Sequence, residues 1–121
     1  MSSEGLLQWQ WKLYPDNHRN RTNLLLHILS NPLFIAGVGG IVAAPILGVW
    51  WPGVAGFLVL PLVMAVQGRG HHLETVAPVP FSSPWNFVAR ILLEQLITFP
   101  RFVLSGGWAR AWRASGTIPA R

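Results

Sequence analysis

Two long runs of apolar residues dominate the middle of the chain. No lysine, arginine, aspartate or glutamate occurs between Thr22 and Gly68, and the runs 32–50 and 53–68 within this interval are almost wholly apolar. A helix needs about 20 apolar residues to cross a membrane, with a range of roughly 17–25. The first run is therefore long enough, whereas the second is marginal unless flanking residues join it.

The segment WWPG (50–53) separates the two runs. Proline and glycine favour a turn, and paired tryptophans are typical of a membrane–water boundary. Five glycines would let the two helices approach closely: Gly37, Gly39, Gly40, Gly48 and Gly56. We therefore expect a transmembrane helical hairpin over residues 32–68, and a pair of half-inserted helices is the alternative.

Shorter amphipathic helices are expected on both sides of the hairpin. Residues 6–13 have apolar side chains at helical spacing, and Asp16 or Asn17 would cap a second helix that runs through His27. These segments are predicted to lie at the membrane interface.

After the hairpin, APVPFSSP (77–84) reads as a loop. Ser83 followed by Pro84 is a typical helix start, and we expect this helix to pair Arg90 with Glu94 and to be interrupted at Pro100. A last amphipathic piece would place Trp108, Arg110, Trp112 and Arg113 at the lipid headgroups.

The chain is accordingly expected to be one all-α membrane domain of 121 residues. Its parts are interfacial helices with a histidine motif (1–31), the transmembrane hairpin (32–68), a loop with histidine and glutamate (69–83), interfacial helices (84–113) and a tail (114–121).

Composition supports a membrane protein. Hydrophobic residues make up 51% of the chain and charged residues only 11%, against a usual charged share of about 25%. The net charge of +5 does not indicate nucleic acid, because the basic residues flank the apolar runs rather than alternating with aromatic residues. By the positive-inside bias, both termini are cytoplasmic. We expect an integral protein of a bacterial inner membrane, and so thin a helical pair leaves a homo-oligomer open.

The four histidines are the candidate chemistry. His18 and His27 precede the hairpin, and His71 and His72 follow it, so the hairpin would bring all four to its cytoplasmic end. The chain has no cysteine, which limits metal ligands to nitrogen and oxygen, and such a set suits iron, zinc or copper. Glu74 offers a nearby carboxylate. The alternative is that the histidines only anchor the chain at the interface.

These residues carry a resemblance to a known family. His18 and Asn20, RTN (21–23) leading to His27, the hairpin, Gln67, GH (70–71) with Glu74, and APVPF (77–81) occur in this order. In these features residues 14–105 resemble the small integral-membrane 2-hydroxy fatty acid dioxygenase-like family. Two positions depart from its pattern: Glu74 is three residues after His71 where the family has four, and Ser30 stands where a glycine is common.

The resemblance implies an Fe(II)-dependent oxygenase that shortens a 2-hydroxy fatty acid by one carbon with dioxygen. His18, His27 and His71 would be iron ligands, His72 an alternative or fourth ligand, and Glu74 a ligand or the partner of one. The fatty chain would lie among the hairpin and residues 84–104. The residues expected to contact the substrate are Arg21, Arg69 and Asn23, with either arginine holding the carboxylate.

Two other functions remain open from the sequence. A non-catalytic membrane scaffold or assembly protein would use the histidines only for anchoring and packing. A zinc- or copper-dependent membrane enzyme would use the same ligands for other chemistry.

Overall fold

The computed structural model describes residues 5–115, and this part of the chain is helical with no strand, as the sequence predicts. Residues 116–121 of the predicted tail lie outside it. In chain order the helices are α1 (Leu6–Leu13), the 3-10 helix η1 (Tyr14–Asn17), α2 (Arg21–Leu47), α3 (Trp51–His71), α4 (Pro84–Leu93), the π-helix η2 (Glu94–Thr98), α5 (Phe99–Leu104) and α6 (Gly107–Ser115).

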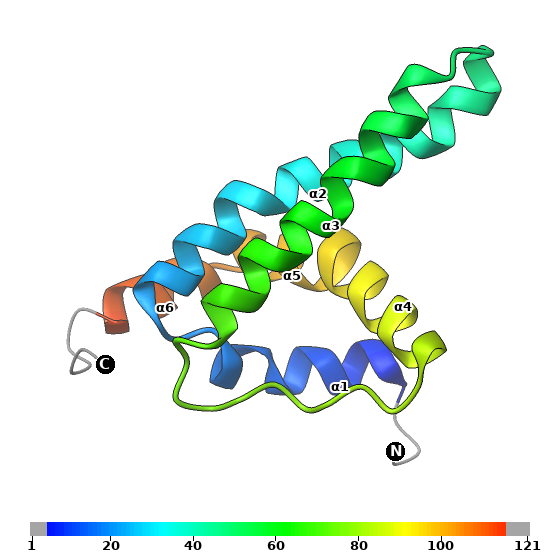
Figure 1. The fold of residues 1–121 in the computed structure, drawn as a ribbon. Coiled ribbons are helices and arrows are strands. Elements are labelled where there is room, and N and C mark those ends of the chain that lie inside the picture. The colour runs from blue at the N-terminus through cyan, green and yellow to red at the C-terminus, as the bar shows by residue number, and fades with distance from the viewer. Residues whose placement is uncertain (1–4, 116–121) are drawn as a thin grey trace.

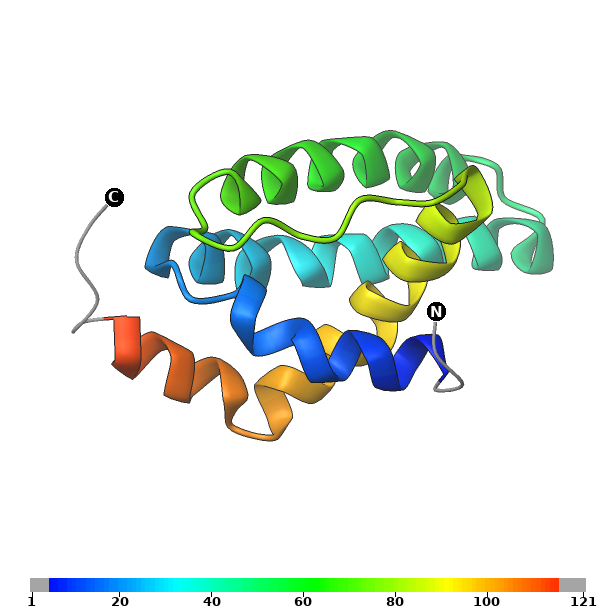
Figure 2. The same ribbon diagram turned by 90° about the horizontal axis from the view of Figure 1, so that it is seen from below.

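Helices α2 and α3 run antiparallel, side by side, and form the long axis of the molecule (Figures 1 and 2). The remaining helices gather around one end of this pair, and the turn between α2 and α3 projects alone at the other (Figure 1). The shorter helices therefore form a cluster around the start of α2 and the end of α3.

Both long helices extend beyond the apolar runs. The predicted helix that runs through His27 and the apolar helix predicted from residue 32 form the single helix α2, which begins at Arg21 because the Asn20 side chain accepts a hydrogen bond from the Asn23 N–H and caps it there. The expected caps, Asp16 and Asn17, instead belong to η1. At its other end α3 continues to His71, so this residue lies on a helix and not in the predicted loop.

Glycines set the distance between α2 and α3. A Cβ atom on Gly56 would lie 2.2 Å from the carbonyl oxygen of Gly37, and one on Gly40 would lie 2.5 Å from that of Pro52. By contrast, Gly39 has open space around it, and Gly48 ends α2 with a positive φ of 68°. Three of the five predicted glycines thus serve the close contact between the helices.

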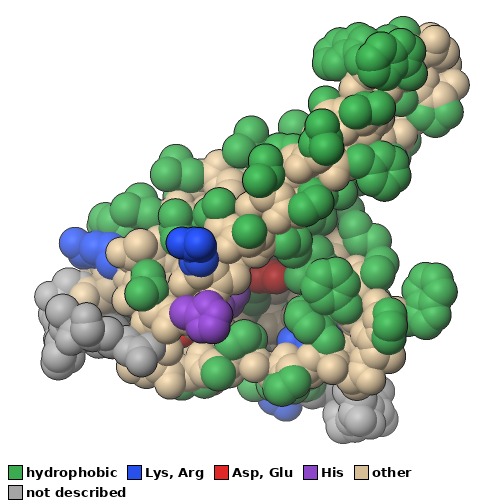
Figure 3. Space-filling view, viewed as in Figure 1, with side chains coloured by type: hydrophobic (Ala, Val, Ile, Leu, Met, Phe, Trp, Pro, Cys, Tyr) green, Lys and Arg blue, Asp and Glu red, His purple; other side chains and the backbone are tan. Residues whose placement is uncertain are grey.

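Both long helices are apolar and long enough to cross a membrane. Only 28% of the most apolar window of α2 and 17% of that of α3 is buried inside the protein. A core helix of a water-soluble domain would be mostly covered by its own chain, whereas these leave large hydrophobic side chains exposed along most of their length (Figure 3). Such a surface requires another covering, and a bilayer supplies one.

Helices α4, η2 and α5 follow one another without a break. The Ser83 side chain caps α4 by accepting from the Asn86 N–H at 3.0 Å, as the sequence predicts. The predicted interruption at Pro100 is wrong. Proline lacks the N–H of a regular helical hydrogen bond, and its ring crowds the carbonyl group four residues earlier. The helix accommodates Pro100 without breaking, because the turn before it widens to a π turn in which the Phe99 N–H donates to the Glu94 carbonyl.

The hydrophobic core lies between η1, α2 and α5, and consists of Tyr14, Leu24, Phe99 and Phe102. Helix α6 closes it from the side: the Trp108 indole N–H donates to the Leu24 carbonyl at 3.0 Å, and the Trp112 ring stacks on that of Trp108. Trp108 and Trp112, which the sequence predicts at the lipid headgroups, are half-buried and pack against this core.

Candidate metal centre

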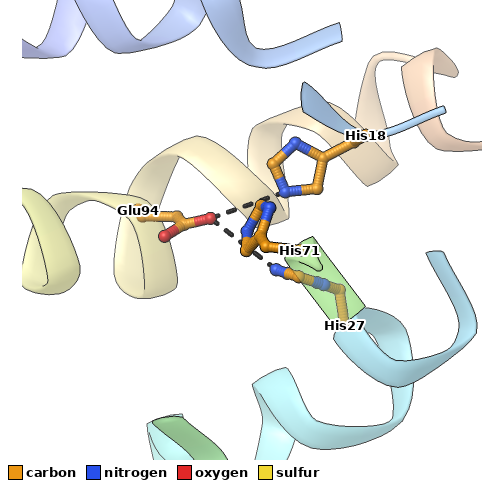
Figure 4. A group of neighbouring side chains, drawn as sticks. All are labelled: His18, His27, His71 and Glu94. Carbon is orange, nitrogen blue, oxygen red and sulfur yellow. Dashed lines mark ion pairs between the residues drawn. The ribbon is translucent and has the colours of Figure 1, made fainter. Parts of the chain in front are cut away.

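Four side chains from separate segments converge at the end of the helical pair (Figure 4). His18 directly follows η1, His27 lies on α2, His71 ends α3, and Glu94 begins η2. One ligand atom from each lies within 4.8 Å of the others. The Glu94 Oε2 atom is 3.7 Å from Nε2 of His18 and 3.9 Å from Nε2 of His27.

Backbone carbonyl groups fix the orientation of two of these rings. Nδ1 of His18 donates to the Tyr14 carbonyl at 2.9 Å, and Nδ1 of His27 donates to the Asn23 carbonyl at 3.0 Å. A carbonyl oxygen only accepts, so each neutral ring carries its proton on Nδ1 and its lone pair on Nε2. Both lone pairs therefore face the centre of the group, which is how metal-bound histidines are usually held.

The nitrogen atoms that face the centre have no hydrogen-bond partner within residues 5–115. They are Nε2 of His18, Nε2 of His27 and Nδ1 of His71, and all three are buried. An unpaired buried polar atom costs about 1–3 kcal/mol, and most such atoms in proteins are paired. Three of them pointing at one carboxylate are the arrangement that a bound cation would satisfy.

The distances fit a metal ion. Bonds of about 2.0–2.2 Å from a metal to nitrogen and oxygen place two of its ligand atoms no more than roughly 4.4 Å apart. The 3.7 and 3.9 Å separations from Glu94 lie inside this limit, and the bound of 4.8 Å on the whole group exceeds it by a few tenths of an ångström, so small side-chain movements would complete the coordination. Three imidazoles and one carboxylate suit iron, zinc or copper, and they leave coordination positions open on an ion that takes five or six ligands.

Electrostatics also favour a cation. Burial, and then the neighbouring His27 and His71, hold the pKa of His18 well below its ordinary value, so the ring is neutral at pH 7. The His18–Glu94 approach is thus not an ion pair of the apoprotein. Burial raises the pKa of Glu94 to about 7, although the Tyr14 hydrogen bond and the Arg90 charge oppose the rise. A cation at the centre would stabilise the charged carboxylate.

Tyr14 supports two of the four side chains. Its hydroxyl group donates to Oε2 of Glu94 at 3.0 Å, and its ring stacks on the His18 ring with centroids 3.8 Å apart. Burial and the nearby Glu94 hold the pKa of Tyr14 well above its ordinary value, so the phenol keeps its proton and remains a donor.

A buried amide network lies beside the site. Gln67 and Gln95 pair through their side-chain amides, Gln67 also donates to the Ser30 hydroxyl at 2.9 Å, and Asn31 donates to the Gln95 side chain at 2.9 Å. The network joins α2, α3 and η2, the helices that carry His27, His71 and Glu94. It fixes their relative positions in the buried interior, where unpaired polar groups would be costly.

Glu74, the predicted carboxylate ligand, has a different place. Its carboxylate accepts hydrogen bonds from the backbone N–H groups of Arg19 and Asn20 at 3.0–3.1 Å and from the Asn23 amide at 2.7 Å. It therefore holds the segment that positions His18, and Glu94 supplies the carboxylate of the site. Asn23, which the sequence predicts to contact substrate, is fully buried. Its side-chain amide donates to Glu74, and its backbone carbonyl accepts from His27 and orients that ring.

Three further predicted residues lie away from the four converging side chains. His72 is exposed and is not a member of the group. The Arg21 guanidinium bonds the Ser115 hydroxyl and the Trp112 carbonyl and lies over the Trp112 ring. Arg69 is exposed on the last turn of α3. The structure thus separates these residues from His18, His27 and His71, which it brings together.

Two cavities reach the group from different sides. One of about 60 Å³ lies between α1 and the loop at residues 78–79, and it is lined by Tyr14, His18, His71 and Glu94 among others. The second, of about 220 Å³, lies between α3 and α4 and ends at His71, Arg90 and Glu94. In the space-filling view, an acidic side chain is visible in a hollow of this face, close to histidine (Figure 3).

Sequence reasoning missed Glu94, Tyr14 and Arg90 as members of the site. The sequence predicts that Arg90 pairs with Glu94; the two charges attract each other, but the Arg90 guanidinium donates its hydrogen bonds to the carbonyl oxygens of Val79 and Pro80. The available signal was a lone carboxylate in an otherwise apolar helix, since an ionisable group at membrane depth is a functional candidate by default.

Comparisons of this chain with protein-family models, with curated proteins and with solved structures found no match.

Proposed function

We propose that this protein is an Fe(II)-dependent membrane oxygenase that acts on 2-hydroxy fatty acids. The observation that carries the proposal is the set of three buried imidazole nitrogens, each without a partner in the described chain, that face the Glu94 carboxylate. The order of motifs that resembles the 2-hydroxy fatty acid dioxygenase-like family supplies the substrate and the metal.

A membrane location supports a lipid substrate. Helices α2 and α3 are long, apolar and largely uncovered by the rest of the chain. The candidate metal centre lies at the end of this pair where the flanking helices gather (Figure 1). A fatty acid held with its chain in the bilayer would therefore present its polar end at the depth of the four ligands.

Iron bound to His18, His27, His71 and Glu94 would supply a redox-active ion with the open coordination positions that dioxygen chemistry requires. The residues of the chain have other tasks. Tyr14 holds the Glu94 carboxylate in position through its hydroxyl group. The aromatic rings of Phe99 and Phe102 pack beside His27 and His18 and exclude water from that side.

The overall conversion balances without a separate reductant. A 2-hydroxy acid, R–CHOH–COOH, and one O₂ give R–COOH, CO₂ and H₂O. The C1–C2 bond breaks, C2 loses three electrons on becoming a carboxyl carbon, and C1 loses one on leaving as CO₂. These four electrons reduce dioxygen, so the substrate and dioxygen suffice.

The test begins with protein purified without a histidine tag and loaded with Fe(II) under anaerobic conditions. We expect one iron per chain, dioxygen consumption on adding a 2-hydroxy fatty acid, and the acid one carbon shorter by mass spectrometry. His27→Ala and His71→Ala should lose iron and turnover together. His72→Ala, which removes the exposed neighbouring histidine, is the matched control and should retain both.

The alternatives correspond to distinct outcomes. A chain that binds no transition metal after Fe(II) loading contradicts the proposal and favours a membrane scaffold. Activity that follows Zn(II) or Cu(II) instead of Fe(II) favours another metal enzyme on the same ligands. Iron binding without dioxygen consumption on adding a 2-hydroxy fatty acid would refute the proposed reaction on this substrate, and the proposed metal centre would stand.

A further inference from the structure

An apolar groove of about 500 Å³ lies on the membrane-facing side of the molecule, between α3 and α4. Its walls are formed mainly by Phe57, Leu60 and Met64 of α3 and by Phe87, Val88 and Ile91 of α4. A space of this size is in the range that binds small organic ligands, roughly 300–1,000 Å³. Since it is open at the surface of an apolar helix pair, it can receive a ligand sideways from the bilayer.

The groove continues into the cavity that ends at the candidate metal centre. Met64, Phe87 and Ile91 line both the groove and the cavity of about 220 Å³. The inner end of that cavity is formed by His71, Glu94 and Arg90. An elongated ligand could thus extend from the bilayer to the four converging side chains along one path.

Arg90 gives this inner end a positive charge. Its side chain is 9% exposed, and its guanidinium donates to the carbonyl oxygens of Val79 and Pro80 at 2.8 and 3.2 Å. The Cζ atom of the guanidinium lies 4.3 Å from the ring centroid of Phe81 and 5.0 Å from that of Trp9. These partners are neutral; Glu94, which lines the same cavity, attracts the Arg90 charge, but within residues 5–115 no carboxylate is hydrogen-bonded or ion-paired to the guanidinium. A buried cation is costly without an anion, and the cavity leaves room for one.

We propose that Arg90 binds the carboxylate of a single-chain acyl anion whose hydrocarbon chain lies in the groove between α3 and α4. The identity of the reaction rests on the proposed function, but the binding site is defined by Arg90 and the groove alone. The guanidinium matches a carboxylate with two parallel hydrogen bonds. Arg90 precedes Glu94 by one helical turn, so a carboxylate held there would present its adjacent carbon atoms to the metal centre.

The charge selectivity is tested on the metal-free protein in detergent. The probes are palmitic acid, which lacks the 2-hydroxyl group of the proposed substrate, and hexadecanol, which has the same chain without the charge. Binding can be followed by calorimetry or by tryptophan fluorescence. We expect the wild-type protein to bind the acid about tenfold or more tightly than the alcohol, since a hydrogen bond to a charged group is the stronger kind. If the wild-type protein binds the acid and the alcohol with equal affinity, Arg90 is not a carboxylate-binding residue, and no variant is needed to reach that conclusion.

Arg90→Gln should abolish the preference for the acid and leave alcohol binding unchanged. Arg69→Gln is the matched control: it removes the same charge from an exposed position on α3 and should keep the preference. Helix content by circular dichroism shows that each variant is folded. A folded Arg90→Gln protein that still prefers the acid by the wild-type factor would refute the role of Arg90.

The groove is tested separately by filling it. Met64→Trp should weaken binding of both acid and alcohol about tenfold or more, because the larger side chain occupies the shared path. Leu62 is 66% exposed on the same helix and does not line the groove, so Leu62→Trp should bind both ligands as wild type does. Equal binding by the two variants would contradict the groove as the chain site.

The two proposals fail in distinguishable ways. Iron content and dioxygen consumption are measured on the metal-loaded protein, and acid binding on the metal-free protein. If the acid binds with the expected dependence on Arg90 and Met64 but iron is absent, the oxygenase proposal fails and the acyl site stands. If iron is present but neither variant changes acid binding, the acyl site fails.

Discussion

Replacing Tyr14 with phenylalanine tests whether Glu94 is a metal ligand that the Tyr14 hydroxyl group holds in place by a hydrogen bond. The substitution removes the hydroxyl group that donates to Glu94 at 3.0 Å. It keeps the ring that stacks on His18 at 3.8 Å and fills the core. We therefore expect a folded protein with all four ligands present and one of them less well held.

The expected loss of metal affinity is 10- to 100-fold. Removing a hydrogen-bond partner of a metal ligand typically costs about 10–100-fold in affinity, which corresponds to about 1.4–2.7 kcal/mol. A hydrogen bond to a charged group contributes a similar amount, about 1.5–3 kcal/mol. The bond matters most in the metal-bound protein, where Glu94 must be charged.

The pH dependence gives a second signature of the same substitution. Burial raises the pKa of Glu94 to about 7, so below pH 7 the apoprotein carries a proton that a metal must displace. Affinity should rise about tenfold per pH unit up to pH 7 and level off above it. The Tyr14 hydrogen bond lowers the pKa of Glu94, and its loss should move this break to higher pH.

The groups that face Glu94 are Tyr14, His18, His27, His71 and Arg90. The pKa of His18 is held well below its ordinary value, so this ring does not titrate near pH 7. Zn(II) titrations against a competing chelator between pH 5.5 and 8.5 measure both effects. A Tyr14→Phe protein with wild-type affinity and an unmoved break would refute the support of Glu94 by Tyr14.

Two further predictions concern the scaffold. Gly56→Ala should lower the free energy of unfolding in detergent by about 1–3 kcal/mol, as overpacking commonly does, because the new Cβ would lie 2.2 Å from the Gly37 carbonyl oxygen. Gly39→Ala is the control, since its Cβ would have nothing within 4 Å, and it should be neutral or slightly stabilising. Equal losses of stability in the two variants would contradict the close contact between α2 and α3. Glu74→Gln should weaken Zn(II) binding about tenfold although no ligand is removed, since its carboxylate orders the backbone of Arg19 and Asn20 beside His18; unchanged binding, measured by the same chelator competition, would show that this segment is held without it.

The sequence predicts the helices well because their signals are local. The apolar runs, the Ser83–Pro84 start and the glycines each specify a nearby backbone conformation or a contact between neighbouring helices. The boundaries of α2 and α3 were missed because they depend on specific contacts: Asn20 caps a helix whose first turns are polar. The π turn at Glu94 has a sequence cause in Pro100, but a proline alone does not distinguish a break from a widened turn.

The site was predictable only in part for a related reason. His18, His27 and His71 follow from folding the two long helices against each other, since that places their flanks at one end. The choice between Glu74 and Glu94 requires the packing of η2 against α2 and α3 through Asn31, Gln67 and Gln95. That packing joins residues distant in the chain, and no spacing rule reveals it. The same holds for Arg90.

The coordination of bound iron tests the central claim most directly. X-ray absorption of the Fe(II)-loaded protein should show three imidazole ligands and at least one oxygen ligand at about 2.0–2.2 Å. The imidazole signal should fall by one ligand, or the iron should be lost, in His27→Ala, and it should be unchanged in His72→Ala. Iron bound without imidazole ligands, or an identical spectrum in His27→Ala, would contradict a centre formed by His18, His27, His71 and Glu94.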